Sequence, residues 1–381
     1  MPMFKIAYIS TENPYDINNN GGIGTYTGVI ARGIAQLGHQ VHCVTIGDAK
    51  EREVETNLMV HYIPNPNTSR YSYIDNMKAF FKKISEIQCL YGLDLVESPE
   101  WMAQGFLFSN TNSPFLTTRL HTPLFLIEDM LNNQRLYRES SAIQKLERDQ
   151  AQNSRGVTSP SLSLSSIIED KWDVKSTVIA NPIDISIFDS QFTDQFAVCN
   201  EPFLLFMGRL EYRKGVLTLA ECLREILPCY KNLKVVFCGK DSLFKKKSMK
   251  SRILELCEDY KDRLIFINHA NLEVKKSLLR QAIFVILPSI WENFSYVALE
   301  AMCMKKTIIA SNVGGYSEMI EDGCSGYLVE PNSSSNLAHK IGLLLDGTLS
   351  PTGEKARVRV QDKYDIGVLS HIFESYYCSL I

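Results

Sequence analysis

Short apolar segments alternate with helix-patterned segments along almost the whole chain, in two successive series. In the first series, apolar segments at 4–10 and 41–46 flank a segment at 25–37 whose apolar residues recur at helical spacing. The second series begins with the apolar segment 203–207 and continues in the same way. Because parallel strands need helical crossovers, such alternation predicts an α/β fold of parallel sheets covered by helices.

The two series predict two Rossmann-like domains joined within the polar, irregular stretch at 184–202. We place the N-terminal domain at residues 1–190 and the C-terminal domain at residues 191–364. Ligands of such sheets bind outside the carboxyl ends of the strands. We therefore expect the two sets of strand ends to face each other across a cleft.

Composition excludes several classes of function. The chain has 381 residues, of which 45% are hydrophobic, and a net charge of −3, so a basic field for nucleic acid is absent. No apolar run approaches the ~20 residues that span a bilayer. The ten cysteines lack C-x-x-C or zinc spacing, and no D-x-D follows a predicted strand. We expect reduced thiols, a cytoplasmic location and no bound metal.

The segment 288–302 reads P-S-I-W-E-N-F-S-Y-V-A-L-E-A-M and follows an apolar strand at 283–287. Ser295 is a predicted N-cap of a helix, whose free N–H groups would suit an anion such as phosphate. Glu292 lies at the mouth of this helix and Glu300 lies about two turns along it. Carboxylates suit sugar hydroxyls, so the segment indicates a ligand with both phosphates and hydroxyls.

A second motif, G-R-L-E-Y-R-K-G, runs from Gly208 to Gly215 and follows the predicted strand at 203–207. Arg209 leaves the strand end, and Lys214 precedes a helix. Two cations at this position suit a diphosphate. The alternative interpretation is a solvated turn.

Two motifs of the N-terminal domain complete the candidate site. Gly22 lies in G-G-I-G, which we expect to be a flexible loop that either cradles a phosphate or lies against a sugar. The spacing of these glycines does not match the dinucleotide-binding G-x-G-x-x-G. His121 ends the predicted strand at 115–120, where it contacts a ligand or is a structural side chain.

A further glycine pair occurs in V-G-G-Y-S-E at 313–318, as a turn or a ligand contact. Together with E-N-F-S-Y-V-A-L-E, G-R-L-x-x-x-K-G, G-G-I-G and V-I-A-N-P-I-D, this motif resembles family 4 glycosyltransferases over nearly the whole chain. The resemblance is specific in the C-terminal half and weaker at 50–175. It implies the GT-B fold, retaining and metal-independent chemistry, and a C-terminal helix at about 365–381 that crosses back to the N-terminal domain.

The resemblance also implies roles for individual residues. Glu292 would contact the donor sugar near the reacting carbon, and Glu300 would bind the ribose. Arg209 and Lys214 would stabilise the departing diphosphate, and His121 would reach the donor sugar. The remaining donor-binding residues are Gly22, Gly208, Asn293, Phe294, Ser295 and Tyr296. Asn293 and Ser295 stand where the commonest form of the motif has glycine, and Pro182 replaces a frequent glycine.

The implied reaction moves a hexose from a nucleotide sugar, with a UDP-sugar the first choice, to a hydroxyl of a carbohydrate, lipid-linked or small-molecule acceptor. It requires no cofactor or metal. We expect a monomer or a weak homo-oligomer that does not bind nucleic acid. The alternatives are a catalytically idle sugar-nucleotide-binding partner, a nucleotide-sugar epimerase or a phosphorylase. A nicotinamide-dependent oxidoreductase is disfavoured because its glycine fingerprint is absent.

Two basic segments suggest peripheral contact with a membrane, the alternative being solvated surfaces. The first is a predicted helix face with Lys78, Phe80, Phe81, Lys82 and Lys83. The second is the cluster of Lys245, Lys246, Lys247, Lys250 and Arg252.

Overall fold

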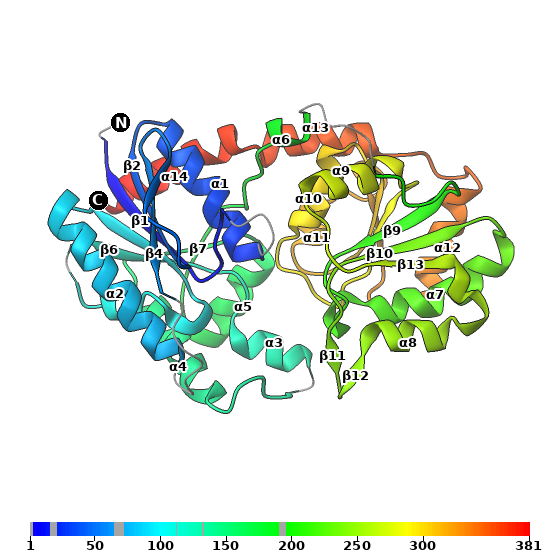
Figure 1. Cartoon of the computed structure of the whole chain (residues 1–381), viewed down its shortest axis with the longest axis horizontal. Coiled ribbons are helices and arrows are strands. Elements are labelled where there is room, and N and C mark those ends of the chain that lie inside the picture. Colours follow the sequence, from blue (N-terminus) through cyan, green and yellow to red (C-terminus); the bar gives the residue numbers. More distant parts are fainter. Residues whose placement is uncertain (1–2, 16–20, 65–71, 112, 132, 190–195) are drawn as a thin grey trace. The chain divides into compact units, whose positions relative to one another are not determined.

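The structure is a computed structural model that describes residues 3–15, 21–64, 72–111, 113–131, 133–189 and 196–381. The chain forms two compact units. Unit 1 comprises Met1–Asp184 and Tyr364–Ile381, and unit 2 comprises Ile185–Lys363. Each unit contains a largely parallel sheet covered by helices (Figure 1), which confirms the predicted pair of Rossmann-like domains.

Unit 1 is built on a sheet with strand order β3-β4-β2-β1-β5-β6-β7-β8. Strand β3 pairs with β4 in the antiparallel direction, and the other pairs are parallel. The order reverses at β1, so the carboxyl ends of β1 and β5 mark the switch point where ligands of such sheets bind. The strands are β1 (Lys5–Ser10), β2 (Gln40–Ile46), β3 (Arg52–Glu55), β4 (Leu58–Ile63), β5 (Leu95–Pro99), β6 (Phe115–Arg119), β7 (Gly156–Ser159) and β8 (Thr177–Val178).

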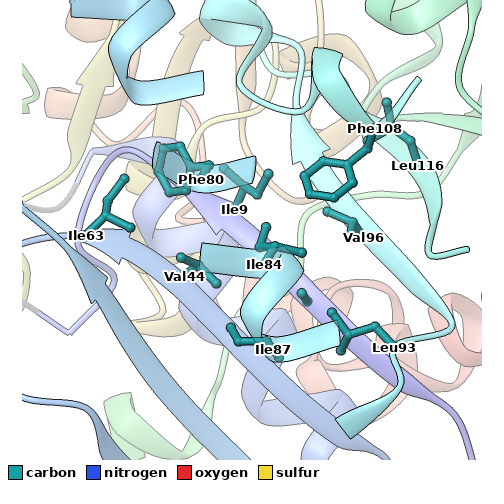
Figure 2. Packing of buried hydrophobic residues seen from close by; sticks show 11 residues of the cluster. Ile9, Val44, Ile63, Phe80, Ile84, Ile87, Leu93, Val96, Phe108 and Leu116 are labelled. Atoms are coloured by element: carbon teal, nitrogen blue, oxygen red, sulfur yellow. The ribbon is translucent and has the colours of Figure 1, made fainter. Parts of the chain in front are cut away.

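Helices cover both faces of this sheet. Alternate side chains of β1 point to opposite faces, so Ala7 and Ile9 join the core beneath α2 (Figure 2), whereas the Tyr8 hydroxyl lies 3.2 Å from that of Tyr377 in α14. The helices of unit 1 are α1 (Gly22–Gln36), α2 (Ser72–Tyr91), α3 (Leu124–Met130), α4 (Ser140–Gln152), α5 (Leu162–Trp172) and α14 (Ile366–Leu380), with short 3₁₀ turns η1 (Trp101–Ala103) and η2 (Phe106–Phe108).

The C-terminal helix α14 packs against α1, as the family resemblance implies. Gly33 of α1 makes the close approach feasible, because a Cβ at this position would lie 2.0 Å from the Ser370 hydroxyl oxygen. The Glu97 carboxylate of β5 accepts hydrogen bonds from Tyr26 of α1 (2.8 Å) and from Tyr377 of α14 (2.7 Å). One buried carboxylate thus ties the end of the chain to its first helix.

Unit 2 has a parallel sheet of order β13-β10-β9-β14-β15-β16 and a separate hairpin of β11 and β12. Its central strand β9 is buried at every residue and contacts α9. The strands are β9 (Phe203–Met207), β10 (Lys234–Cys238), β11 (Leu243–Phe244), β12 (Lys247–Ser248), β13 (Leu264–Ile267), β14 (Val285–Leu287), β15 (Ile308–Ser311) and β16 (Tyr327–Val329). The helices are α6 (Ser186–Asp189), α7 (Val216–Cys229), α8 (Met249–Leu256), α9 (Leu272–Gln281), α10 (Tyr296–Cys303), α11 (Tyr316–Met319), α12 (Ser334–Leu345) and α13 (Gly353–Lys363), with 3₁₀ turns η3 (Tyr212–Lys214) and η4 (Glu258–Arg263).

Several sequence predictions need correction. Gly22 and Gly24 form the first turn of α1 instead of a flexible loop, while residues 16–20 of that predicted loop and 190–195 of the predicted junction lie outside the described residues. The aromatic membrane face proposed for α2 is wrong, because Phe80 is buried in the core (Figure 2). Phe81 is partly buried and packs against the same core. The repeat of apolar residues in α2 therefore faces the sheet. In the described part of the chain, no helix is long and apolar enough to cross a bilayer.

Candidate active site

The loop between β14 and α10 carries the largest group of predicted site residues. Pro288 follows the strand, and Ser295 caps α10 by accepting a hydrogen bond from the Ala298 N–H at 3.2 Å. The predicted N-cap is thus confirmed. Asn293 and Phe294 are buried, and the first turn of α10 contains no acidic residue. The mouth of this helix keeps the positive end of its dipole uncompensated by a side chain of its own first turn.

Lys214 and Glu292 are brought together although 78 residues separate them, and they form an ion pair in which the lysine donates to Oε2 of Glu292. Glu292 is only 7% exposed. The pKa of Lys214 is held below its usual range because burial outweighs the attraction of the Glu292 carboxylate. Both charged groups are therefore poorly hydrated, with side chains only 18% and 10% exposed.

Gly215 explains how the two loops approach so closely. Its φ is +67°, and a Cβ here would lie 1.8 Å from the carbonyl oxygen of Pro288. The N–H of Ile290 donates to the carbonyl of Arg213 at 2.8 Å, which joins the loops by their backbones. Glycine is required for both the conformation and the space.

Glu300 lies in α10 and is paired with Lys275 of α9, whose Nζ is 2.9 Å from Oε1 of Glu300. The other carboxylate oxygen, Oε2, is buried and has no hydrogen-bond partner among the described residues. The Glu300 charge raises the pKa of Lys275. A buried acceptor without a donor is costly, so Oε2 suits a ligand hydroxyl.

Arg209 follows β9 and Gly208, which has a φ of +138°. Its side chain is 66% exposed, and its Nε lies 3.1 Å from Oε1 of Glu211. The same carboxylate oxygen also accepts from Arg213 at 3.1 Å. Arg209 is thus a solvent-facing cation on the motif that carries Lys214.

The glycine pair Gly314–Gly315 was predicted only as a turn or a ligand contact. In the structure it packs against the loop that carries Glu292. The N–H of Gly315 donates to the Glu292 carbonyl at 2.9 Å, and a Cβ on Gly314 would lie 2.1 Å from that carbonyl oxygen. Tyr316 is buried next to them, and burial raises the pKa of its hydroxyl. The paired glycines were the available signal, whereas nothing in the sequence indicated Tyr316 or Lys275.

In unit 1, His121 follows β6, and its backbone N–H donates to both oxygens of the buried Glu100 at 2.8 Å. Its ring meets Tyr26 edge-on with centroids 5.3 Å apart. Burial, with a smaller effect of the nearby Arg119, lowers the pKa of His121 to about 3. The imidazole is therefore neutral near pH 7 and exchanges hydrogen bonds instead of supplying charge.

The mouth of α1 already contains a carboxylate. Oε2 of Glu12 accepts the Gly24 N–H at 2.8 Å, and a Cβ on Gly21 would lie 2.0 Å from Oε1. A Cβ on Gly22 would meet nothing within 4 Å. The N-terminal glycines thus leave room for Glu12, a residue that the sequence patterns did not single out.

The chain has two Rossmann-like units, and the second carries the motif with Arg209 and Lys214 together with the glutamates Glu292 and Glu300. This combination defines a glycosyltransferase of the GT-B class. Residues 188–361 match the family "Glycosyl transferases group 1", and residues 20–187 match "Glycosyltransferase Family 4". The chain belongs to glycosyltransferase family 4, which uses nucleotide-sugar donors.

Individual proteins support the assignment. An uncharacterised glycosyltransferase of Methanocaldococcus jannaschii is 26% identical and covers 95% of this chain and 93% of its own. The lipopolysaccharide 1,2-N-acetylglucosaminetransferase of Salmonella typhimurium is 32% identical over 45% of this chain and 46% of its own. Sucrose-phosphate synthase of Thermosynechococcus elongatus shares the fold with a TM-score of 0.79, 21% identity and 99% coverage of both chains. Anabaena HepE, solved in complex with UDP-glucose, has a TM-score of 0.73 and 18% identity, covering 98% of this chain and 99% of its own.

Proposed function

We propose that this glycosyltransferase is a retaining, metal-independent enzyme that transfers a hexose from a UDP-sugar to an acceptor hydroxyl in the synthesis of a polysaccharide, glycolipid or glycoconjugate. The observation that carries the proposal is the buried pair of Lys214 and Glu292 beside the capped mouth of α10. This group offers a cation and a helix dipole to a diphosphate and a carboxylate to a sugar within one unit.

Each proposed role follows from the chemistry of the transfer. Cleavage between the sugar C1 and the diphosphate develops positive charge on the sugar and negative charge on the leaving group. Lys214, Arg209 and the α10 mouth stabilise the leaving group, with Gly208 and the backbone of residues 293–296 next to its oxygens. Glu292 faces the sugar. A retaining enzyme of this kind does not use the Glu292 and Glu300 carboxylates as a hydrolytic acid–base pair.

In unit 1, Gly22 and His121 are proposed to contact sugar. Since the Glu12 carboxylate already accepts the Gly24 N–H, a phosphate at the same place would meet a like charge. A hydroxyl, in contrast, donates a hydrogen bond to the carboxylate. The arrangement therefore favours the sugar alternative for the N-terminal glycines, and a neutral His121 suits the same kind of ligand.

UDP is our choice of nucleotide because HepE, which has the same fold, was solved with UDP-glucose. The decisive experiment offers UDP-, GDP- and ADP-sugars separately and measures release of the nucleoside diphosphate with and without acceptor. We expect release from a UDP-hexose that rises when a hydroxyl acceptor is added. No release from any donor would support an idle binding partner, and donor conversion without an acceptor would support an epimerase.

Activity is expected to persist after treatment with EDTA. Lys214 and Arg209 supply the positive charge that a divalent ion would otherwise bring to the diphosphate. The check is UDP release before and after dialysis against the chelator. A strict requirement for Mg²⁺ or Mn²⁺ would contradict the proposal.

The variant Glu300→Gln is expected to raise the KM for the donor by roughly 10-fold with a smaller change in kcat, because a charged acceptor for a ribose hydroxyl becomes neutral. Loss of the charge also removes the partner of Lys275. Lys275→Met is the matched control, since it removes the same ion pair and leaves the carboxylate in place. If both variants raise the KM equally, the effect comes from loss of the ion pair with Lys275 and not from a contact with the ribose.

The rate of transfer is expected to fall as the pH rises, and the fall should begin below the ordinary pKa of lysine. The pKa of Lys214 is lowered chiefly by burial, so raising the pH neutralises this cation early and removes its stabilisation of the diphosphate. The measurement is kcat/KM for the donor against pH, which reports the free enzyme, for the natural protein and for Lys214→Arg. Arginine stays protonated, so the alkaline fall in rate should shift to higher pH in the variant. An unchanged fall would mean that a group other than Lys214 causes it.

A further inference from the structure

The hairpin of β11 and β12 has a turn that is unusual in its residues. Phe244 pairs with Lys247, so the turn consists of Lys245 and Lys246, with φ values of +50° and +62°. A two-residue turn with both φ values positive is of type I′, where Asn-Gly is strongly preferred. Two lysines are therefore kept in a conformation that glycine or asparagine would adopt more easily.

The tip of this hairpin concentrates positive charge on the surface of unit 2. Lys245, Lys246 and Lys247 are all exposed, in a chain whose net charge is −3. Lys247 lies 2.5 Å from Glu255, whereas Lys245 and Lys246 have no ion-pair partner in the part of the chain that the structure describes. The uncompensated charge is therefore located on the two turn residues.

An apolar side chain accompanies this charge. Leu243, the first residue of the hairpin, is 74% exposed, whereas the neighbouring Phe244 is buried. The hairpin extends from the rest of unit 2 in Figure 1, next to the label of α8. Exposed cations around an exposed leucine match the two components of an anionic lipid surface, which are phosphate headgroups and acyl chains.

Aromatic stacking fixes the hairpin to the rest of unit 2. The ring of Phe244 stacks on Tyr212 with a centroid distance of 4.3 Å and an interplanar angle of 9°. The guanidinium of Arg252 lies 5.5 Å from the Phe244 ring centroid, and the same side chain donates to the Phe244 carbonyl at 3.1 Å. The lysines are thus presented on a preorganised support, which lowers the entropic cost of binding.

We propose that the β11–β12 hairpin is a contact surface for an anionic lipid bilayer. Lys245 and Lys246 approach the phosphate headgroups, and Leu243 enters the boundary between headgroups and acyl chains. A soluble anionic glycan would use the cations but would gain little from Leu243, so the exposed leucine favours the bilayer. The proposal does not depend on the donor chemistry, because none of these three residues belongs to the proposed transfer site.

The test is co-sedimentation of the full chain with vesicles of phosphatidylcholine, with and without phosphatidylglycerol, at low and high salt. The natural protein is expected to bind only the anionic vesicles and to be released by salt. The variant Lys245→Asn/Lys246→Gly should bind roughly 30-fold more weakly, since each surface cation contributes about fivefold. This variant also relieves the turn, so its melting temperature should be equal or higher and misfolding cannot explain the loss.

Lys171→Gln/Lys175→Gln removes two exposed lysines from unit 1 and is the charge-matched control, which should bind as the natural protein does. Leu243→Ser should weaken vesicle binding without changing UDP release in solution. Binding of Lys245→Asn/Lys246→Gly as tight as that of the natural protein would overturn the proposal. Equal binding of the natural protein to neutral and anionic vesicles would also overturn it. Binding of a soluble anionic polysaccharide in the absence of vesicle binding would overturn it as well. Absence of UDP release by the natural protein would count against the proposed transferase activity and not against the proposed membrane contact.

Discussion

Replacing Lys214 with alanine is expected to lower kcat by roughly 100- to 1000-fold, or about 3–4 kcal/mol of transition-state stabilisation. Lys214 is buried, paired with Glu292, and placed where the leaving diphosphate would develop charge. Removing this cation exposes the departing group to the Glu292 carboxylate without compensation. The measurement is single-turnover release of UDP, which separates chemistry from product release.

The same substitution leaves Glu292 buried without its lysine, so stability must be followed in parallel. Breaking a buried pair on one side costs roughly 3–5 kcal/mol of unfolding free energy. Arg209→Ala is the matched control, because Arg209 is largely exposed and its loss should change stability by less than about 0.5 kcal/mol while still lowering kcat. The double variant Lys214→Ala/Glu292→Gln should regain stability but not turnover. Recovery of turnover in the double variant would show that Lys214 serves only to neutralise Glu292.

Replacing Gly215 with alanine is expected to destabilise unit 2 by roughly 2–5 kcal/mol, the sum of a left-handed backbone for a residue with Cβ and overpacking against a backbone atom. The Cβ would lie 1.8 Å from the Pro288 carbonyl oxygen at a φ of +67°. Since Pro288 opens the loop that carries Glu292, relief of the clash should separate Glu292 from Lys214. Urea unfolding of unit 2 measures the free energy of unfolding. The rate of UDP release reports whether Glu292 and Lys214 have separated.

Gly347→Ala distinguishes the two contributions. Gly347 has a similar φ of +74°, but a Cβ there would meet nothing within 4 Å, so its substitution should cost only about 1–2 kcal/mol and leave turnover unchanged. A cost at Gly215 no larger than the cost at Gly347 would mean that the loops do not need their close approach. Turnover by Gly215→Ala at the rate of the natural protein would mean that the reaction does not need this close approach.

Local patterns in the sequence predicted much of the fold because the signals for parallel sheets are strong and short-ranged. The buried strand at 203–207 and the N-cap Ser295 were both predicted at their observed places. The hairpin of β11 and β12 and the edge strand β16 were not predicted. Strands of two or three residues at an edge or in a hairpin carry too few side chains to show a period.

The amino-acid sequence by itself determined which kinds of group this protein would offer a ligand, namely two glutamates eight residues apart, the cations Arg209 and Lys214 in one motif, and glycines at strand ends. Only the tertiary structure decided how these groups are paired. Lys214 meets Glu292, Lys275 meets one oxygen of Glu300 and leaves the other without a partner, and Glu12 fills the mouth of α1. The physical reason is that such pairs depend on packing between loops and helices distant in sequence, where a single glycine such as Gly215 determines whether two backbones can touch.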